Sequence, residues 1–285
     1  MYRRRSLALE LLLHGVIWLA LAFALFPIAW VISASFDQTN TLVGQRLIPS
    51  YVTLDNYRML VADERYPFFR WLWNSIKVSG LHSFFSVFLC ALAAYAFSRF
   101  RFRGRRAGLF ALILVQIFPQ VLAMVAIYLL LLAIGRVVPA FGLNTHAGLI
   151  MVYLGGAVGV NTWLMKGYFD TIPRSLEESA MIDGATHFQA FVRIILPLVR
   201  PILAVVFILT FIGSYSDFIL ARVLLQSNEN LTLAVGMNLF IADQYARRWG
   251  IFSAGALIAS LPVVAIFLLL QKQLIAGLAK GAVKG

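Results

Sequence analysis

The chain has 285 residues, of which 61% are hydrophobic and only 13% are charged, and its mean hydropathy is +0.85. Because a soluble domain is about 45–50% apolar and about 25% charged, this composition excludes a free-standing cytosolic enzyme and a disordered chain, and a single cysteine, Cys90, excludes a disulfide-bonded scaffold. The net charge of +12 would suggest nucleic-acid binding in a soluble protein, but in a chain surrounded by membrane lipid it records which loops face the cytoplasm, so we expect no nucleic-acid partner.

Six apolar runs are long enough to cross a bilayer, since a helical span needs about 20 mostly apolar residues. They cover residues 11–32, 78–97, 108–134, 147–164, 201–220 and 251–270. The runs are continuous rather than alternating in polarity, which favours helices over strands. The first run is longer than the about 7–15 apolar residues of a signal peptide, so we interpret it as an uncleaved anchor behind a short tail, residues 1–10. These runs predict an all-α, polytopic membrane protein whose transmembrane domain covers residues 11–285.

Three prolines lie in the interior of the apolar runs. Pro27 lies in the first run, Pro119 interrupts the third and Pro262 the sixth. Spanning helices tolerate proline because neighbouring helices satisfy the freed backbone groups. We therefore expect each run to remain one span, with a bend at the proline.

Basic residues predict the orientation of the chain. Fifteen of the 24 lysines and arginines lie in the N-terminal tail, the 98–107 loop, the 165–200 loop and the C-terminal tail, and eight lie in the loops of the other side. Short cytoplasmic loops carry the excess of basic residues, so both termini are predicted to be cytoplasmic. Six spans, an even number, agree with this.

The loop between the fourth and fifth spans, residues 165–200, is longer than a connection needs. Ser175 and Glu178 follow Pro173 with the spacing of a capping box, in which the serine accepts the third helical N–H and the glutamate reaches back. Gly184 lies two turns later, and glycine readily takes the left-handed conformation that ends a helix. We therefore predict a short helix that ends at this glycine.

A second short helix is predicted directly after the first. Thr186 and Gln189 have capping-box spacing, and Pro197 is expected to end the helix just before Pro201 opens the fifth span. Two short amphipathic helices outside the bilayer fit a docking element for a cytoplasmic protein. The alternative is a helix pair that lies on the lipid headgroups.

The sequence of this loop resembles a known family. Residues 178–185, Glu-Ser-Ala-Met-Ile-Asp-Gly-Ala, and residues 194–197, Ile-Ile-Leu-Pro, resemble the EAA loop of binding-protein-dependent ABC importer permeases, with Ser179 in place of the motif's middle alanine. Further stretches resemble the MalG-type permeases of maltose and maltodextrin importers: 142–146, 153–156, 166–169, 201–209, 232–237 and 281–285. The resemblance runs from about residue 71 to the last residue, and its best-matching core is 71–275.

The resemblance implies a fold, a location and partners. The fold is the type I ABC importer permease, multi-pass in a bacterial inner membrane. Its function would be to import maltose, maltodextrin or a related oligosaccharide by alternating access, with trehalose or another sugar as the alternative. The partners would be a second, MalF-type permease subunit in a heterodimer, a cytoplasmic ATPase dimer that carries ATP and Mg, and an extracytoplasmic sugar-binding protein. This chain would hold no cofactor and would not be an enzyme.

The resemblance also assigns roles by position. The ATPase-coupling residues of the EAA loop would be Glu178, Ser179, Ala180, Asp183, Gly184 and Pro197. The C-terminal tail that reaches the ATPase would include Lys280, Lys284 and Gly285. The loop that contacts the binding protein would include Asn238, Asp243, Gln244 and Tyr245. The sugar in the membrane would be held chiefly by the partner permease.

Catalytic patterns are absent from the sequence. No phosphate-binding G-x-x-x-x-G-K-[ST] loop and no H-E-x-x-H or G-x-S-x-G motif occurs, and the four histidines lack the spacing of metal ligands, so we assign no catalytic residue and no metal site. Ser214 and Asp217 are candidates for lining the transport path, while an ion pair of Asp217 with Arg222 at the membrane boundary is the alternative. A membrane-embedded enzyme or ion-translocating bundle acting alone is disfavoured because intramembrane acids, histidines and nucleophiles form no cluster in the sequence.

Overall fold

The computed structural model describes residues 7–41, 44–242 and 247–282, and nearly all of its regular structure is helical. Among these residues the single β pairing is an isolated bridge between Asp37 and Val52. The longer helices are α1 (Leu7–Ser35), α3 (Phe68–Arg99), α4 (Arg105–Ile117), α5 (Met124–Val137), α6 (His146–Phe169), α10 (Arg200–Tyr215) and α13 (Trp249–Ala282). The shorter α-helices are α2 (Asp55–Ala62), α7 (Ser175–Ile182), α8 (His187–Ala190), α9 (Leu196–Leu198), α11 (Ile219–Leu224) and α12 (Leu233–Asn238). Short 3-10 helices cover Gln120–Ala123, Pro139–Phe141 and Asn228–Asn230, and a π-helical turn covers Phe191–Ile195. The predicted all-α class is confirmed.

The chain divides into two compact units, residues 1–69 with 236–260, and residues 70–235 with 261–285. In the first unit, polar side chains join the segment after α1 to α2. The Asn56 amide donates to the carbonyl oxygens of Ser35 and Asp37 at 3.0 and 2.9 Å. In the same unit the backbone N–H of Trp249, at the start of α13, donates to the Asn40 carbonyl. These contacts hold the first unit together.

Within the described ranges, four helices are long and apolar enough to cross a membrane, and the number rises to six if each of two bent helix pairs is counted as one span. The four are Leu9–Ser35, Phe68–Arg99, His146–Phe169 and Trp249–Ile275. All four are longer than their apolar runs, most clearly α3, which begins at Phe68 rather than at residue 78, and α13, which continues past residue 270 to Ala282. Polar and aromatic residues at helix ends belong to no apolar run, so hydropathy alone underestimates these helices.

The third predicted span, 108–134, is not one continuous helix. Helix α4 ends at Ile117, and the segment that starts at Val121 is turned from it by 80°. Pro119 lacks an N–H and disfavours helical backbone at the residue before it, and Phe118 accordingly takes extended dihedrals. The proline therefore breaks the span rather than bending it.

The fifth predicted span, 201–220, also differs at its end. Helix α10 ends at Tyr215, and a separate helix, α11, begins at Ile219. The carboxylate of Asp217 accepts the backbone N–H of Ala221 at 3.0 Å, which satisfies one of the donors that the first turn of α11 leaves unpaired. A polar residue at the end of the apolar run thus starts a separate helix.

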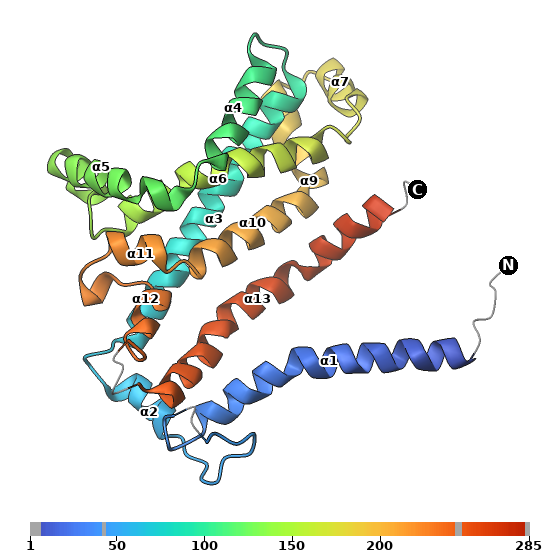
Figure 1. Ribbon diagram of the computed structural model, residues 1–285. Coiled ribbons are helices and arrows are strands. Elements are labelled where there is room, and N and C mark those ends of the chain that lie inside the picture. Colours follow the sequence, from blue (N-terminus) through green and yellow to red (C-terminus); the bar gives the residue numbers. More distant parts are fainter. Residues whose placement is uncertain (1–6, 42–43, 243–246, 283–285) are drawn as a thin grey trace. The chain divides into compact units, whose positions relative to one another are not determined.

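The core of the second unit lies where α3, α6 and α10 approach one another, as the teal, green and orange helices in Figure 1 illustrate. Its buried side chains come from the C-terminal half of α3, the end of α6, the π-helical turn and the start of α10. They are Cys90, Ala91, Ala94, Tyr95, Met165, Phe169, Phe191, Ile195, Val199, Ile202 and Val206. This core joins the loop that follows α6 to the membrane helices.

Helices α4 and α6 pack closely at a glycine. A Cβ atom built on Gly159 would overlap the carbonyl oxygen of Leu112, so only glycine fits at this crossing. Beside it, the Gln116 amide nitrogen donates to the Gly156 carbonyl at 2.5 Å, and its oxygen accepts the Val160 N–H at 3.1 Å. The glutamine thus binds the two backbone groups that an unbroken α-helix would pair with each other.

Candidate functional site

The loop after α6 begins with α7, but the predicted capping box of Ser175 and Glu178 is wrong. The backbone of Arg174 is already helical, and its carbonyl accepts the N–H groups of Glu177 and Glu178, both at 3.0 Å. Ser175 therefore lies inside the first turn, where its hydroxyl cannot cap the helix, and no side chain caps this end. Glu178 keeps no capping role.

The turn between α7 and α8 agrees with the prediction. Gly184 has φ +90°, which a residue with a Cβ rarely adopts, and Asp183 forms the C-cap of α7. The Ala185 N–H donates back to the Ala180 carbonyl at 2.9 Å, as in a Schellman-type end. The second capping box is confirmed, because Thr186 and Gln189 exchange side-chain and backbone hydrogen bonds.

The residues that the family resemblance assigns to ATPase coupling lie mostly on the surface of this hairpin. Glu178, Ser179, Asp183 and Gly184 are exposed, and Ala180 is half-buried. Two large apolar side chains flank them: Ile182 is 86% exposed and Phe188 is 69% exposed. We call these seven residues the α7–α8 surface. Exposed apolar side chains beside small and acidic ones are typical of a surface that binds another protein.

Pro197 lies elsewhere, and its predicted role as a helix end is wrong. The helix that begins at α8 continues through a π-helical turn and α9 to Leu198, so Pro197 lies inside it. The π-helical turn directly before α9 relaxes the backbone where proline cannot donate a hydrogen bond. The chain then bends by 76° before α10, which has Pro201 in its first turn as predicted.

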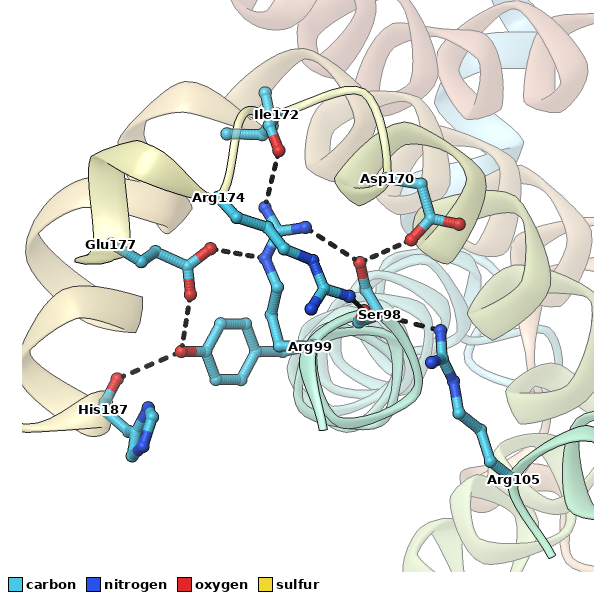
Figure 2. Close-up of polar contacts among 9 residues, drawn as sticks. Ser98, Arg99, Arg105, Asp170, Ile172, Arg174, Glu177 and His187 are labelled. Carbon is cyan, nitrogen blue, oxygen red and sulfur yellow. Dashed lines mark hydrogen bonds and ion pairs between the residues drawn. The ribbon is translucent and has the colours of Figure 1, made fainter. Parts of the chain in front are cut away.

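A buried ion pair fastens α7 to the end of α3. The Arg99 guanidinium donates to one carboxylate oxygen of Glu177, and the Tyr95 hydroxyl donates to the other at 2.9 Å. The side chains of Arg99 and Glu177 are only 7% and 5% exposed. Figure 2 shows the Arg99 guanidinium between Glu177, the Ile172 carbonyl and the Ser98 hydroxyl. The guanidinium nitrogens donate to the Ile172 carbonyl oxygen at 3.0 Å and to the Ser98 hydroxyl oxygen at 3.2 Å. Both charges are thus surrounded by hydrogen-bond partners.

The same contact set extends to the end of α6. The Ser98 hydroxyl donates to Asp170 at 2.6 Å, and Arg174 donates to the Ser98 carbonyl at 2.9 Å. Burial alone would raise the pKa of Asp170, but hydrogen bonds from Lys166 and Ser98 hold that pKa below its usual value. We call Tyr95, Ser98, Arg99, Asp170 and Glu177 the anchor. The anchor ties α7 to the ends of α3 and α6.

Sequence reasoning did not select the anchor. Arg99 is one of five arginines between residues 98 and 107, and Glu177 stands next to Glu178 with no difference in local pattern. The two acids differ only in the structure, where Glu177 falls on the side of α7 opposite the exposed residues. Which acid meets which arginine depends on how two distant segments pack.

Ser214 and Asp217, the candidates for path lining, lie together beside an open cavity of about 280 Å³. Asp217 accepts from the Tyr153 hydroxyl at 2.8 Å and from the Ala221 N–H. Its alternative partner, Arg222, forms no ion pair with it in the part of the chain that the structure describes. The Ser214 hydroxyl donates to the Thr210 carbonyl within α10.

The remaining candidates fall near or beyond the ends of the described ranges. Asn238 is half-buried at the end of α12. Lys280 lies in α13, of which the backbone alone is described at that position. The other predicted contact residues lie outside the described residues: Asp243, Gln244, Tyr245, Lys284 and Gly285.

Comparisons with known proteins identify relatives over nearly the whole chain. Residues 86–280 match the family model described as "binding-protein-dependent transport system inner membrane component". The chain is 43% identical to the maltose/maltodextrin transport system permease protein MalG of Vibrio vulnificus (strain YJ016) and 42% identical to that of Escherichia coli (strain K12). Each alignment covers 95% of this chain and 95% of the relative.

Two solved structures have the same fold. One is a bacterial ABC transporter involved in the import of the acidic polysaccharide alginate, with a TM-score of 0.78 and 24% identity over 95% of this chain and 98% of the other. The second is a bacterial alginate ABC transporter in complex with an alginate pentasaccharide-bound periplasmic protein, with a TM-score of 0.65 and 21% identity over 93% and 92%. Since both identities are below 25%, these matches concern the fold.

Proposed function

The chain belongs to the family of binding-protein-dependent transport system inner membrane components, and we propose that it is the permease subunit of an ATP-driven importer for maltose and maltodextrins. It is a transport subunit and a multi-pass inner-membrane protein, as its relatives are. Support for the sugar comes from the two maltose/maltodextrin permeases that share over 40% of its residues across 95% of the chain.

The observation that carries the mechanism is the α7–α8 surface held on the anchor. A chain without a phosphate-binding loop must take its energy from elsewhere, and we propose that a cytoplasmic ATPase dimer binds this surface. ATP and Mg would be bound by that dimer, and this chain would hold no cofactor. Glu178, Ser179 and Gly184 would contact the ATPase directly, and Ile182 and Phe188 would be buried on binding.

The proposed movement passes through two rigid connections. When the ATPase dimer closes, α7 moves, and the buried ion pair of Arg99 and Glu177 transmits that movement to α3. The helix from α8 to α9 meets α10 at a 76° bend, so it transmits the same movement to α10. The two connections would turn α3 and α10 together and open the path to the other side of the membrane, as alternating access requires.

Other parts of the chain would bind other partners. A second, MalF-type permease subunit would complete the path as a heterodimer. We propose that Asn238, Asp243, Gln244 and Tyr245 contact the extracytoplasmic sugar-binding protein, and that Lys280, Lys284 and Gly285 reach the ATPase dimer. The transmembrane domain would cover residues 11–285, with a permease core at 71–275 and a coupling loop at 165–200.

Uptake of labelled sugar tests the proposal. The gene for this chain is deleted in its own host, and entry of radiolabelled maltose, maltotriose and trehalose is measured with and without a plasmid copy. We expect maltose and maltotriose uptake to be lost on deletion and restored by the plasmid. Loss of trehalose uptake alone would assign the chain to trehalose, and unchanged uptake of all three sugars would contradict the proposal.

A further inference from the structure

The open cavity beside Asp217 lies inside the second unit, among α3, α6, α10 and α11. Its polar lining falls at helical spacing. Tyr153 and Asn161 lie eight residues apart on α6, and Thr210, Ser214 and Asp217 follow one another at four and three residues along α10 and its end. Such spacings place side chains on one face of a helix. Two helices therefore turn a polar face toward the same space.

His82 is a buried polar group in this lining that lacks a partner. The residue is 5% exposed, and neither ring nitrogen makes a hydrogen bond, although backbone groups of Tyr153 and Thr210 lie near the ring. The His82 and Tyr153 rings are 5.4 Å apart. A buried donor or acceptor without a partner costs free energy, so each such group requires an explanation. A ligand in the cavity would supply one.

Two further groups are available to a ligand. Both hydrogen bonds to the Asp217 carboxylate, from the Tyr153 hydroxyl and the Ala221 N–H, end at Oδ2, which leaves Oδ1 as an acceptor. The half-buried Asn161 amide makes no side-chain hydrogen bond within the described ranges of the chain. The cavity thus offers a carboxylate oxygen, an amide and an imidazole.

We propose that this cavity is a subsite for one pyranose ring of the transported sugar, so that this chain itself contacts the sugar in the membrane. Asp217 Oδ1 accepts a sugar hydroxyl, the Asn161 amide accepts one hydroxyl and donates to another, and His82 pairs with a third. Leu209 and Leu220 line the cavity and face the C–H groups of the ring. This inference rests on the proposed function.

The size and charge of the cavity favour this ligand. About 280 Å³ lies at the lower end of small-molecule sites, which suits one sugar ring rather than a whole oligosaccharide. The lining holds one carboxylate and no lysine or arginine, and its other polar groups are neutral donors and acceptors. A neutral ligand with several hydroxyl groups matches that set, and the open side of the cavity leaves room for the rest of the chain of sugars.

Protection of a cysteine from labelling tests the contact directly. Because Cys90 is the only cysteine of the chain, Asn161→Cys is made in a Cys90→Ser background and the complete transporter is reconstituted in proteoliposomes. Labelling of this chain by N-ethylmaleimide is timed with and without maltose. At about ten times the Kd we expect labelling to slow about tenfold, because bound sugar reduces the free fraction. Val160→Cys is the control, because Val160 lies one residue along α6, is 49% exposed and does not line the cavity. It should label at the same rate with and without maltose.

A second variant tests the chemistry without changing the shape. Asp217→Asn keeps an oxygen for Tyr153 and Ala221 but replaces the free Oδ1 with a donor. The loss of one charge-assisted hydrogen bond should raise the KM for maltose uptake about tenfold.

The outcomes separate the two proposals. If the wild-type transporter imports maltose while Asn161→Cys labelling ignores the sugar and Asp217→Asn keeps the wild-type KM, the subsite is wrong and the proposed function stands. If the wild-type transporter imports neither maltose nor maltotriose, the proposed function is wrong, and the sugar subsite with it.

Discussion

At the scale of single residues, the ion pair of Arg99 and Glu177 is the contact that fixes the loop after α6 to the end of α3. Taking two charges out of water costs free energy, which is offset only when every charged atom has a partner. Here the guanidinium also donates to the Ile172 carbonyl, and the carboxylate also accepts from Tyr95. The pair therefore fixes the position of α7 more than it adds to stability.

Removing one member of the pair should be costly. We expect Glu177→Ala to destabilise the folded chain by about 3–5 kcal/mol, because it leaves the Arg99 charge buried and unpaired. Thermal melting of the purified transporter in detergent measures the change. Glu178→Ala removes the same groups from the exposed neighbour and should stay within about 0.5 kcal/mol of wild type. Equal melting temperatures for the two variants would contradict the stabilising role of the buried ion pair in the anchor.

At the scale of elements, α7, the turn and α8 form a short, rigid hairpin. Gly184 reverses the chain, the Thr186 capping box starts α8, and the continuation through Pro197 reaches the bend before α10. The continuous helix through Pro197 makes the connection longer and stiffer than a helix that ended there would be. A rigid connection is what transmission of a partner's movement requires.

A proline at the turn should leave insertion of the subunit into the membrane intact and abolish its coupling to the ATPase. Gly184→Pro forces φ to about −65° where the turn needs +90°, and it removes the N–H that donates to Met181, so the hairpin cannot form. We expect normal amounts of the subunit in membranes, with loss of ATPase co-purification and sugar uptake. Gly167→Ala is the control, because Gly167 is an exposed helical position where a Cβ meets no atom within 4 Å. This variant should transport normally. Wild-type uptake by Gly184→Pro would refute the coupling role of the hairpin.

At the scale of the whole molecule, the basic residues and the predicted number of spans together predict which side each loop faces. The anchor uses Arg99, and the loops that carry the excess of lysine and arginine include those at the ends of α3 and α6. The positive-inside bias and the proposed ATPase site therefore fall on one side of the membrane.

Reporter fusions test that orientation. Green fluorescent protein fused after Gly285 should fluoresce, and alkaline phosphatase fused at Glu229, in the 3-10 helix between α11 and α12, should be active, because the first folds in the cytoplasm and the second outside it. Exchanging the two reporters provides the control, since each should then be silent. The reverse pattern would place the C-terminus outside and the segment between α11 and α12 in the cytoplasm.

Much of this protein was predictable from its sequence. The apolar runs indicated the helices, Gly184 and Thr186 indicated the turn and the start of α8, and residues 178–185 indicated the family. These features depend on neighbours within a few residues, so local pattern suffices. The capping role of Ser175 failed even locally, since the helix begins one residue earlier.

The sequence by itself determined that the chain is a helical membrane protein and where the short helices of the 165–200 loop lie, because hydropathy and capping act over short stretches of chain. Only the tertiary structure decided that Glu177 rather than Glu178 is the buried partner of Arg99, 78 residues away along the chain. The same holds for the cavity in which His82, Asn161 and Asp217 meet. Burial and hydrogen-bond partners arise when distant helices pack, and no local pattern encodes which of two neighbouring side chains will face the other helix.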